Sequence, residues 1–396
     1  MFVFIWATLL FSLRVSDAET GSSVWGKQSC PLTDYCITLV EGEITAEAGL
    51  CVVIPCSFTV PEDIKVLHIV WFKCESTEGN CGDGDMIFNS NTFSDQVRSE
   101  FKGRVSLLES DVSKKNCSII INDLKESDSG EYKHRVEALP VAGSGTFSQT
   151  ANVSVQGLSQ RPTVMIPPLT EGQLTTLTCT APGLCSGSEP AFNWRWRGRG
   201  ESDADLTGNI TAIETENVTE FAKRRSSTLF FSPSAEHHGT NITCTVLFQG
   251  HVSTEETATL SVSYPPTEPI LSMRSEVTEG QTITVSCTVE SFPQSTLTLM
   301  RIDRNNQPLK ITGNNLYSRP INSLSHKFTV TSVDAGWYFC RAQNTEGSKD
   351  SEQQELLVKC DWFSCGLFFS NKQIKPNLLS ENLSIKKKLF LCIFQM

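Results

Sequence analysis

The stretch Asp334-Ala-Gly-Trp-Tyr-Phe-Cys340 decides the fold of the last third of the chain. An Asp-x-Gly-x-Tyr turn with a cysteine two residues later is typical of a β-sandwich, in which the tyrosine hydroxyl bonds to nearby backbone and the cysteine bridges two sheets. A partner cysteine ends the alternating segment Thr282-Ile-Thr-Val-Ser-Cys287. We therefore expect a sandwich closed by Cys287–Cys340, with Leu299 or Met300 where a core tryptophan usually stands.

The same pattern occurs twice upstream, as a repeat of about 100 residues. In the middle unit the order is Cys179, Trp194 and Cys244, and the first unit has Cys56 followed by Trp71. A chain of 396 residues is also too long for a single core. We predict an all-β protein of three tandem immunoglobulin-like β-sandwiches, a V-set domain followed by two C2- or I-set-like domains. Their expected ranges are 37–156, 160–264 and 267–359.

The first unit departs from this pattern at one cysteine. Its turn is Asp128-Ser-Gly-Glu-Tyr132, yet His134 stands where the bridging cysteine belongs. Cys56 therefore needs another partner, and Cys117 on the expected strand E is the candidate, because strands B and E are neighbours in one sheet. Such a bridge lies within one sheet and lets the two sheets separate further.

The other cysteines suggest cross-links outside the cores. Cys51 lies five residues before Cys56 and so faces the other side of the strand. Cys185 is surplus in the second unit, and a Cys51–Cys185 bridge would hold the first two domains rigidly together. Cys74 and Cys81 would close a small loop after strand C, and Cys30 and Cys36 are left as a candidate pair.

The chain reads as a secretory-pathway protein. The apolar run Met1–Leu13 and the small residues around Ala18 predict a signal peptide at 1–18. Fifteen cysteines then indicate disulfides in an oxidising compartment. After Lys359 the strand pattern ends in an atypical tail, 360–396, with no apolar run near the ~20 residues of a membrane helix. Glycosylation sequons stand at Asn116, Asn152, Asn209, Asn217 and Asn241, and a further one in the tail at Asn382.

Composition limits the function to binding. A net charge of -11 disfavours nucleic acid and anionic membranes as partners, since both are bound by clustered Lys and Arg. The six histidines show no metal-ligand spacing, and no serine or cysteine nucleophile motif is present. We therefore expect no enzyme, no metal and no cofactor.

One candidate site lies on strand F of the first unit, Glu131-Tyr-Lys-His-Arg-Val-Glu137. If Tyr132 and His134 point inward, alternation directs Lys133 and Arg135 outward from the exposed GFCC′ sheet. A planar guanidinium there suits a carboxylate, because it offers two parallel charge-assisted hydrogen bonds. The plain alternative is a surface arginine paired with Glu137.

Several segments together resemble the sialic-acid-binding immunoglobulin-like lectins, the Siglecs. They are Gly49-Leu-Cys-Val-Val-Ile-Pro-Cys-Ser-Phe58, Trp71-Phe-Lys73, Gly103-Arg-Val-Ser-Leu-Leu108, Asn116-Cys-Ser-Ile-Ile-Ile121 and Asp128–Glu137, with Cys185 and His238-Gly-Thr-Asn-Ile-Thr-Cys244 in the second domain. The resemblance covers roughly 37–264, and the third domain is similar only as a generic immunoglobulin domain.

The resemblance implies a V-set lectin domain in which Arg135 clamps the carboxylate of sialic acid. Family members also pack the sugar on aromatic side chains of strands A and G; Trp25 is the match on strand A, and Phe147 stands in for the missing Trp or Tyr on strand G. The implied partners are sialylated glycans on glycoproteins or glycolipids, in cell adhesion and immune-cell recognition. The alternative is an adhesion or receptor domain that binds a protein through the same sheet. The expected location is the cell surface in a longer form, or secretion if this chain is complete.

Overall fold

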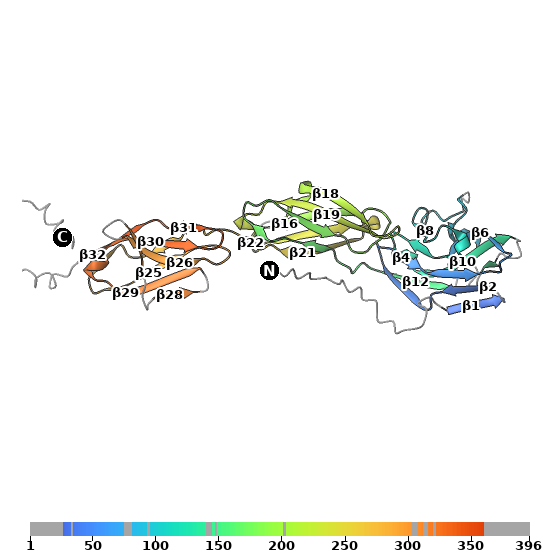
Figure 1. Cartoon of the computed structure of the whole chain (residues 1–396), viewed down its shortest axis with the longest axis horizontal. Helices are drawn as coiled ribbons and strands as arrows, with labels where there is room; N and C mark the ends of the chain where they lie inside the picture. Colours follow the sequence, from blue (N-terminus) through green and yellow to red (C-terminus); the bar gives the residue numbers. More distant parts are fainter. Residues whose placement is uncertain are drawn as a thin grey trace, which may run out of the picture.

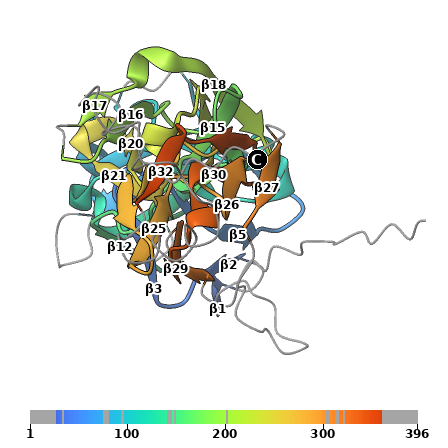
Figure 2. The ribbon, with the colours of Figure 1, turned by 90° about the vertical axis from the view of Figure 1, so that its left-hand side faces the viewer.

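The computed structural model describes residues 27–32, 35–74, 81–92, 96–139, 145–146, 149–200, 203–302, 307–311, 316–319 and 322–359. The expected signal peptide at 1–18, Trp25, Phe147 and the tail at 360–396 lie outside this part. Within it, the regular elements are β-strands and short 3-10 helices, and no helix is long and apolar enough to cross a bilayer. The strands form three sandwiches in a row (Figure 1). Figure 2 looks along this row from the third domain.

The first sandwich has a front sheet in the order β3-β12-β10-β6-β7, with β11 paired to β10. These strands are β3 (Glu43–Glu47), β6 (Lys65–Cys74), β7 (Met86–Asn89), β10 (Gly130–Leu139), β11 (Gly145–Thr146) and β12 (Ala151–Gln156). The back layer consists of two three-stranded sheets, β1-β2-β5 and β4-β9-β8. Its strands are β1 (Lys27–Leu32), β2 (Tyr35–Leu39), β4 (Val52–Ile54), β5 (Cys56–Thr59), β8 (Val105–Leu107) and β9 (Ile119–Ile121). Strand β1 thus adds a hairpin ahead of residue 37.

The core of the first domain forms where the two layers meet. Trp71 and Tyr132 are fully buried there. The Trp71 indole N–H donates to the Cys117 carbonyl at 2.9 Å, and the Tyr132 hydroxyl donates to the Asp128 carbonyl. These bonds satisfy the polar ends of two large aromatic side chains, so both can be buried without an unpaired donor.

The second sandwich packs the sheet β13-β15-β19-β18 against β17-β16-β20-β21, with a short β14-β22 pair. Its strands are β13 (Thr163–Met165), β14 (Leu169–Thr170), β15 (Thr175–Thr180), β16 (Ala191–Arg197), β17 (Ala204–Asp205), β18 (Ile210–Asn217), β19 (Lys223–Phe231), β20 (Asn241–Leu247), β21 (Ser253–Thr259) and β22 (Val262–Ser263). Trp194 lies opposite Cys244 in the strand register and is fully buried, as in a standard immunoglobulin core.

The third sandwich packs β23-β25-β29-β28 against β24-β32-β30-β26-β27, with β31 paired to β30. Its strands are β23 (Ile270–Ser272), β24 (Glu276–Thr278), β25 (Thr282–Thr288), β26 (Thr296–Ile302), β27 (Pro308–Lys310), β28 (Leu316–Arg319), β29 (Ser323–Thr329), β30 (Gly336–Gln343), β31 (Ser348–Asp350) and β32 (Gln354–Lys359). Leu299 takes the tryptophan position, opposite Cys340, whereas Met300 lies opposite Phe339. Of the two candidates, Leu299 is therefore the core residue.

Six disulfides occur among the described residues: five are the expected pairs, and Cys30–Cys36, left as a candidate pair, also forms. Cys56–Cys117 joins the start of β5 to the segment just before β9, both in the back layer, with the Cys117 N–H also donating to the Cys56 carbonyl at 3.0 Å. The bridge therefore lies within the back layer, where it links the β1-β2-β5 and β4-β9-β8 sheets and not strands of one sheet as expected, and it does not reach the front sheet. The remaining pairs are Cys30–Cys36, Cys51–Cys185, Cys74–Cys81, Cys179–Cys244 and Cys287–Cys340.

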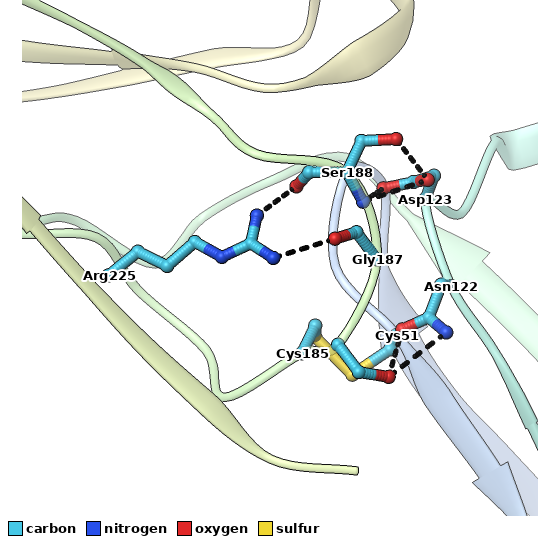
Figure 3. Close-up of a disulfide and its surroundings, with 8 residues drawn as sticks. Cys51, Asn122, Asp123, Cys185, Gly187, Ser188 and Arg225 are labelled. Atoms are coloured by element: carbon cyan, nitrogen blue, oxygen red, sulfur yellow. Dashed lines mark hydrogen bonds between the residues drawn. A yellow bond between two sulfur atoms is a disulfide. The ribbon is translucent and has the colours of Figure 1, made fainter. Parts of the chain in front are cut away.

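The junction between the first two domains is cross-linked by more than the disulfide Cys51–Cys185 (Figure 3). Asp123 of the first domain accepts hydrogen bonds from the Ser188 N–H at 3.0 Å and from its hydroxyl at 2.7 Å. Arg225, which is buried, in turn donates to the carbonyls of Gly187 and Ser188. The loop 185–188 is thus held from both sides, and this arrangement favours one orientation of the two domains.

Candidate functional site

Arg135 lies in the middle of β10, on the outer side of the front sheet. In the register it stands opposite Val70 of β6 and Thr146 of β11. Burial along β10 alternates, with Tyr132, His134 and Val136 buried and the residues between them partly exposed. The strand therefore directs the guanidinium away from the core, as alternation predicted.

A small apolar cluster lies beneath Arg135, separate from the main core. Val70, Phe72 and Met86 are buried on the outer side of the front sheet, and Cys81 and Val97 pack against them. The Arg135 guanidinium carbon lies 5.0 Å from the centre of the Phe72 ring. This is cation–π distance, and the ring both supports the cation and keeps water from one of its faces.

Sequence reasoning missed Phe72 as part of the site. The signal was present, because Trp71 points into the core and the next residue on a strand must point outward. A large aromatic side chain on the exposed face of a sheet needs a covering group. Here the Arg135 side chain lies over the ring, and Cys81 and Val97 pack against the same cluster.

Two carboxylates of the chain contact the Arg135 guanidinium. Nη1 lies 3.3 Å from Asp83 Oδ1, and Nη2 lies 3.1 Å from Glu137 Oε1. The Arg135 side chain is 29% exposed, against 67% for Asp83 and 36% for Glu137. Arg135 Nε is buried and has no hydrogen-bond partner among the described residues. The guanidinium thus binds carboxylate oxygens through its two outer nitrogens.

The pairing with Glu137 is the plain alternative that the sequence offered, since both side chains project from the same face of β10. Asp83 was not foreseen. It begins the 3-10 helix η1 (Asp83–Asp85), two residues after Cys81, and the disulfide Cys74–Cys81 ties this segment to the end of β6. The arrangement shows that the outer face of the front sheet can hold an anion at Arg135.

The other predicted ligand residues have different outcomes. Lys133 lies on the same face as Arg135, opposite Phe72 in the register, and is partly exposed. Trp25 and Phe147 lie outside the described residues, so their place beside Arg135 stays a prediction. The structure therefore brings Arg135 together with Phe72, Asp83 and Glu137.

His134 points to the opposite side of the sheet from Arg135. It is fully buried, and its ring lies 5.3 Å from the Trp71 ring, centroid to centroid. Burial lowers the pKa of His134 to about 3, so the ring is neutral at pH 7. One ring nitrogen lies within 4.8 Å of both sulfurs of Cys56–Cys117, but sulfurs joined in a disulfide are not thiolate ligands for a metal. His134 therefore fills the core in place of the usual cysteine.

The sequons of the described domains differ in how well they present the asparagine. Asn116 is half-buried, and its side-chain oxygen accepts from the Ser118 N–H at 2.9 Å. The Asn241 oxygen accepts from the Thr259 hydroxyl. Of the predicted glycosylation sites, the exposed ones are Asn152, Asn209, Asn217 and Asn241.

The fold and the site define an immunoglobulin-fold chain whose first domain carries an outward arginine on strand F. Comparison with known families agrees with this class. The family model described as B-cell receptor CD22-like, first Ig-like, matches residues 46–156, and the one described as immunoglobulin domain matches 268–358.

Similar proteins identify the family. Human sialic acid-binding Ig-like lectin 9 is 30% identical over 352 residues, which cover 82% of this chain and 69% of that protein. Human sialic acid-binding Ig-like lectin 5 is 31% identical over 358 residues, which cover 83% of this chain and 59% of that protein. The chain belongs to the family of sialic acid-binding Ig-like lectins. It spans 59% and 69% of the length of these two relatives.

Among solved structures, the three-domain ectodomain of mouse nectin-like molecule 4 aligns with a TM-score of 0.41 at 19% identity. The alignment covers 84% of this chain and 99% of that one.

Proposed function

We propose that this chain is a lectin that binds sialylated glycans through the first domain, with Arg135 as the residue that holds the sialic acid carboxylate. The observation that carries the proposal is the outward guanidinium in the middle of the front sheet, already in contact with carboxylate oxygens of the chain itself. Family membership supports the choice of sialic acid as the source of the carboxylate.

The chemistry of the contact follows from the arginine. Its guanidinium stays charged at any physiological pH, and its N–H groups are spaced to donate two parallel hydrogen bonds to one carboxylate. The Phe72 ring beneath the cation limits its motion, so less side-chain entropy is lost when a ligand binds. Charge-assisted hydrogen bonds of this kind contribute about 1.5–3 kcal/mol each.

The site is open rather than enclosed, and this limits the affinity for one sugar. Arg135 lies on a sheet face, where solvent and salt weaken the attraction between charges. We expect weak binding of a single sialoside and strong binding only when many are displayed together, because linked contacts raise the effective concentration. A location at the cell surface or in the secretory pathway is proposed with this function, since sialylated glycans occur there and disulfides persist there.

The experiment compares the full chain with Arg135→Ala and Arg135→Lys variants on cells before and after sialidase treatment. We expect the wild type to lose binding on treated cells, Arg135→Ala to lose about ten- to a hundredfold on untreated cells, and Arg135→Lys to bind weakly because it lacks the planar fork. Equal binding by the wild type and Arg135→Ala would overturn the proposal. Wild-type binding that survives sialidase would instead favour a protein ligand for the front sheet.

A further inference from the structure

The outer nitrogens of Arg135 are already occupied by carboxylates of the chain. We infer that Asp83 and Glu137 compete with the ligand for Arg135, and that Asp83 is the residue that sets how open the site is. This inference rests on the proposed role of Arg135 and adds an internal regulator to it.

The geometry of the guanidinium explains the competition. A carboxylate can bind either the end of the group, through Nη1 and Nη2, or its side, through Nε and one outer nitrogen. Nε is buried, so the end is the edge open to an incoming ligand. At that end Nη1 faces Asp83 and Nη2 faces Glu137. A ligand carboxylate that approaches this end therefore competes with both side chains for the cation and its N–H groups.

The third domain has an arginine at the equivalent place in its strand F, with a closer carboxylate partner on the neighbouring strand β31. Arg341 follows Tyr338 by three residues, as Arg135 follows Tyr132, and it too projects from strand F. Asp350 accepts from its Nε and Nη2 at 2.7 Å each, a complete fork. Asp83 and Glu137 each bind Arg135 through one nitrogen only, at 3.3 and 3.1 Å. Arg135 is thus held more loosely than Arg341. A ligand carboxylate can therefore replace the carboxylates of the chain more easily at Arg135.

Asp83 and Glu137 differ in how easily they move away. Glu137 is two residues from Arg135 on the same strand and face, so it stays near the cation in every state of the sheet. Asp83 lies 52 residues away in sequence, in a segment held by Cys74–Cys81 on one side and by β7 on the other. Its side chain is 67% exposed and can leave without opening any core. Asp83 is therefore the adjustable competitor.

The first test measures affinity for the two sialyllactose isomers, in the full chain and in Asp83→Asn, Glu137→Gln and the double variant. The loss of an exposed competing ion pair predicts about a two- to fivefold tighter Kd for Asp83→Asn, and more for the double variant. Glu131→Gln is the matched control, because it removes one negative charge from the same face of β10 without a contact to Arg135 in the structure. Asp83→Asn affinity equal to that of Glu131→Gln would overturn the inference.

A second test needs no sugar and separates this inference from the lectin proposal. Phenylglyoxal reacts with exposed guanidinium groups, and peptide mass spectrometry reports the rate at each arginine. We expect Arg135 to react faster in Asp83→Asn than in the wild type, while the rate at Arg341 is the same in both proteins, because its partner Asp350 is unchanged. Faster reaction at Arg135 without sialoside binding in any variant would support the internal competition and reject sialic acid as the ligand. An unchanged rate at Arg135 would reject the competition itself.

Discussion

The His134 ring packs against the Trp71 indole, with 5.3 Å between centroids, at the position where a sandwich of this kind usually has its second disulfide cysteine. The disulfide has moved to Cys56–Cys117 within the back layer. At this level the front sheet and the back layer are therefore held together by packing and by the Trp71–Cys117 hydrogen bond, with no disulfide between them among the described residues. Because the packing includes a titratable ring, the stability of the first domain depends on pH.

Acid is expected to destabilise the first domain through His134. Burial lowers the pKa of His134 to about 3, whereas an unfolded histidine titrates near 6.5, so between these values the unfolded state binds a proton that the native state does not. Stability is therefore greatest above about pH 6.5 and falls as the pH decreases, by about 2 kcal/mol at pH 5. Hydrogen exchange of the β10 and β6 amides between pH 7.5 and 5 measures this loss.

The control for this prediction is His134→Leu. Leucine fills a similar volume in the core but cannot bind a proton. Its exchange-derived stability is expected to change less with pH than that of the wild type. An equal pH dependence in both proteins would assign the effect to other groups and contradict the prediction.

Breaking the Arg104–Asp128 pair is expected to cost far more stability than breaking a surface pair. Nη1 and Nη2 of Arg104 lie 2.8 and 3.1 Å from the two Asp128 oxygens, and the side chains are 11% and 3% exposed. Asp128→Asn leaves the largely buried arginine charge with neutral acceptors, among them the carbonyls of Glu100 and Asp123, at a cost of about 3 kcal/mol. Thermal unfolding measures it. Lys114→Ala, which breaks an exposed pair with Glu109, is the control and is expected to change stability far less, because solvent screens that pair.

Much of the fold could be predicted from the sequence because its signals are local or geometrically strict. Strand alternation directs Arg135 outward and His134 inward whatever the rest of the domain does. A disulfide needs a short Cα separation. With no cysteine at position 134, Cys117 on the neighbouring strand E was the candidate partner of Cys56. The same strictness made Cys51 and Cys185 a predictable link between domains.

The part of the site that could not be predicted depends on the paths of loops. Loops have no repeating pattern comparable to the alternation of a strand. Asp83 reaches Arg135 through the course of the segment after Cys81, and no pattern in the sequence specifies that course. Asp123 meets Ser188 across a domain junction for the same reason. The Phe72 ring, in contrast, was predictable from alternation with Trp71, but exposure alone did not reveal that Arg135 would cover it.

Gly187→Ala is expected to disturb the junction between the first two domains. A Cβ atom at this position would meet Asp123 Oδ1 at 2.7 Å and Asn122 Cβ at 2.8 Å, so the loop must shift and weaken the Asp123–Ser188 bonds. We expect a loss of about 1–3 kcal/mol, measured by thermal unfolding, and faster hydrogen exchange at the junction. Gly208→Ala in the same domain meets nothing within 4 Å and is the control. Equal behaviour of the two variants would contradict the close contact.

Phe72→Leu is expected to weaken sialoside binding with the first domain still folded, provided that Arg135 is the ligand residue. Leucine fills most of the same apolar space between Val70 and Met86 but offers no ring to the guanidinium above it. A cation–π contact whose cation stays partly exposed contributes about 0.5–1 kcal/mol, which predicts about a two- to fivefold weaker Kd. Phe101→Leu is the matched control, since it removes the equivalent contact of Arg104 on Phe101, 4.9 Å apart, away from the site. That variant should lose stability but keep its Kd. If both variants bind as the wild type does, the Phe72 ring only fills space and does not position Arg135.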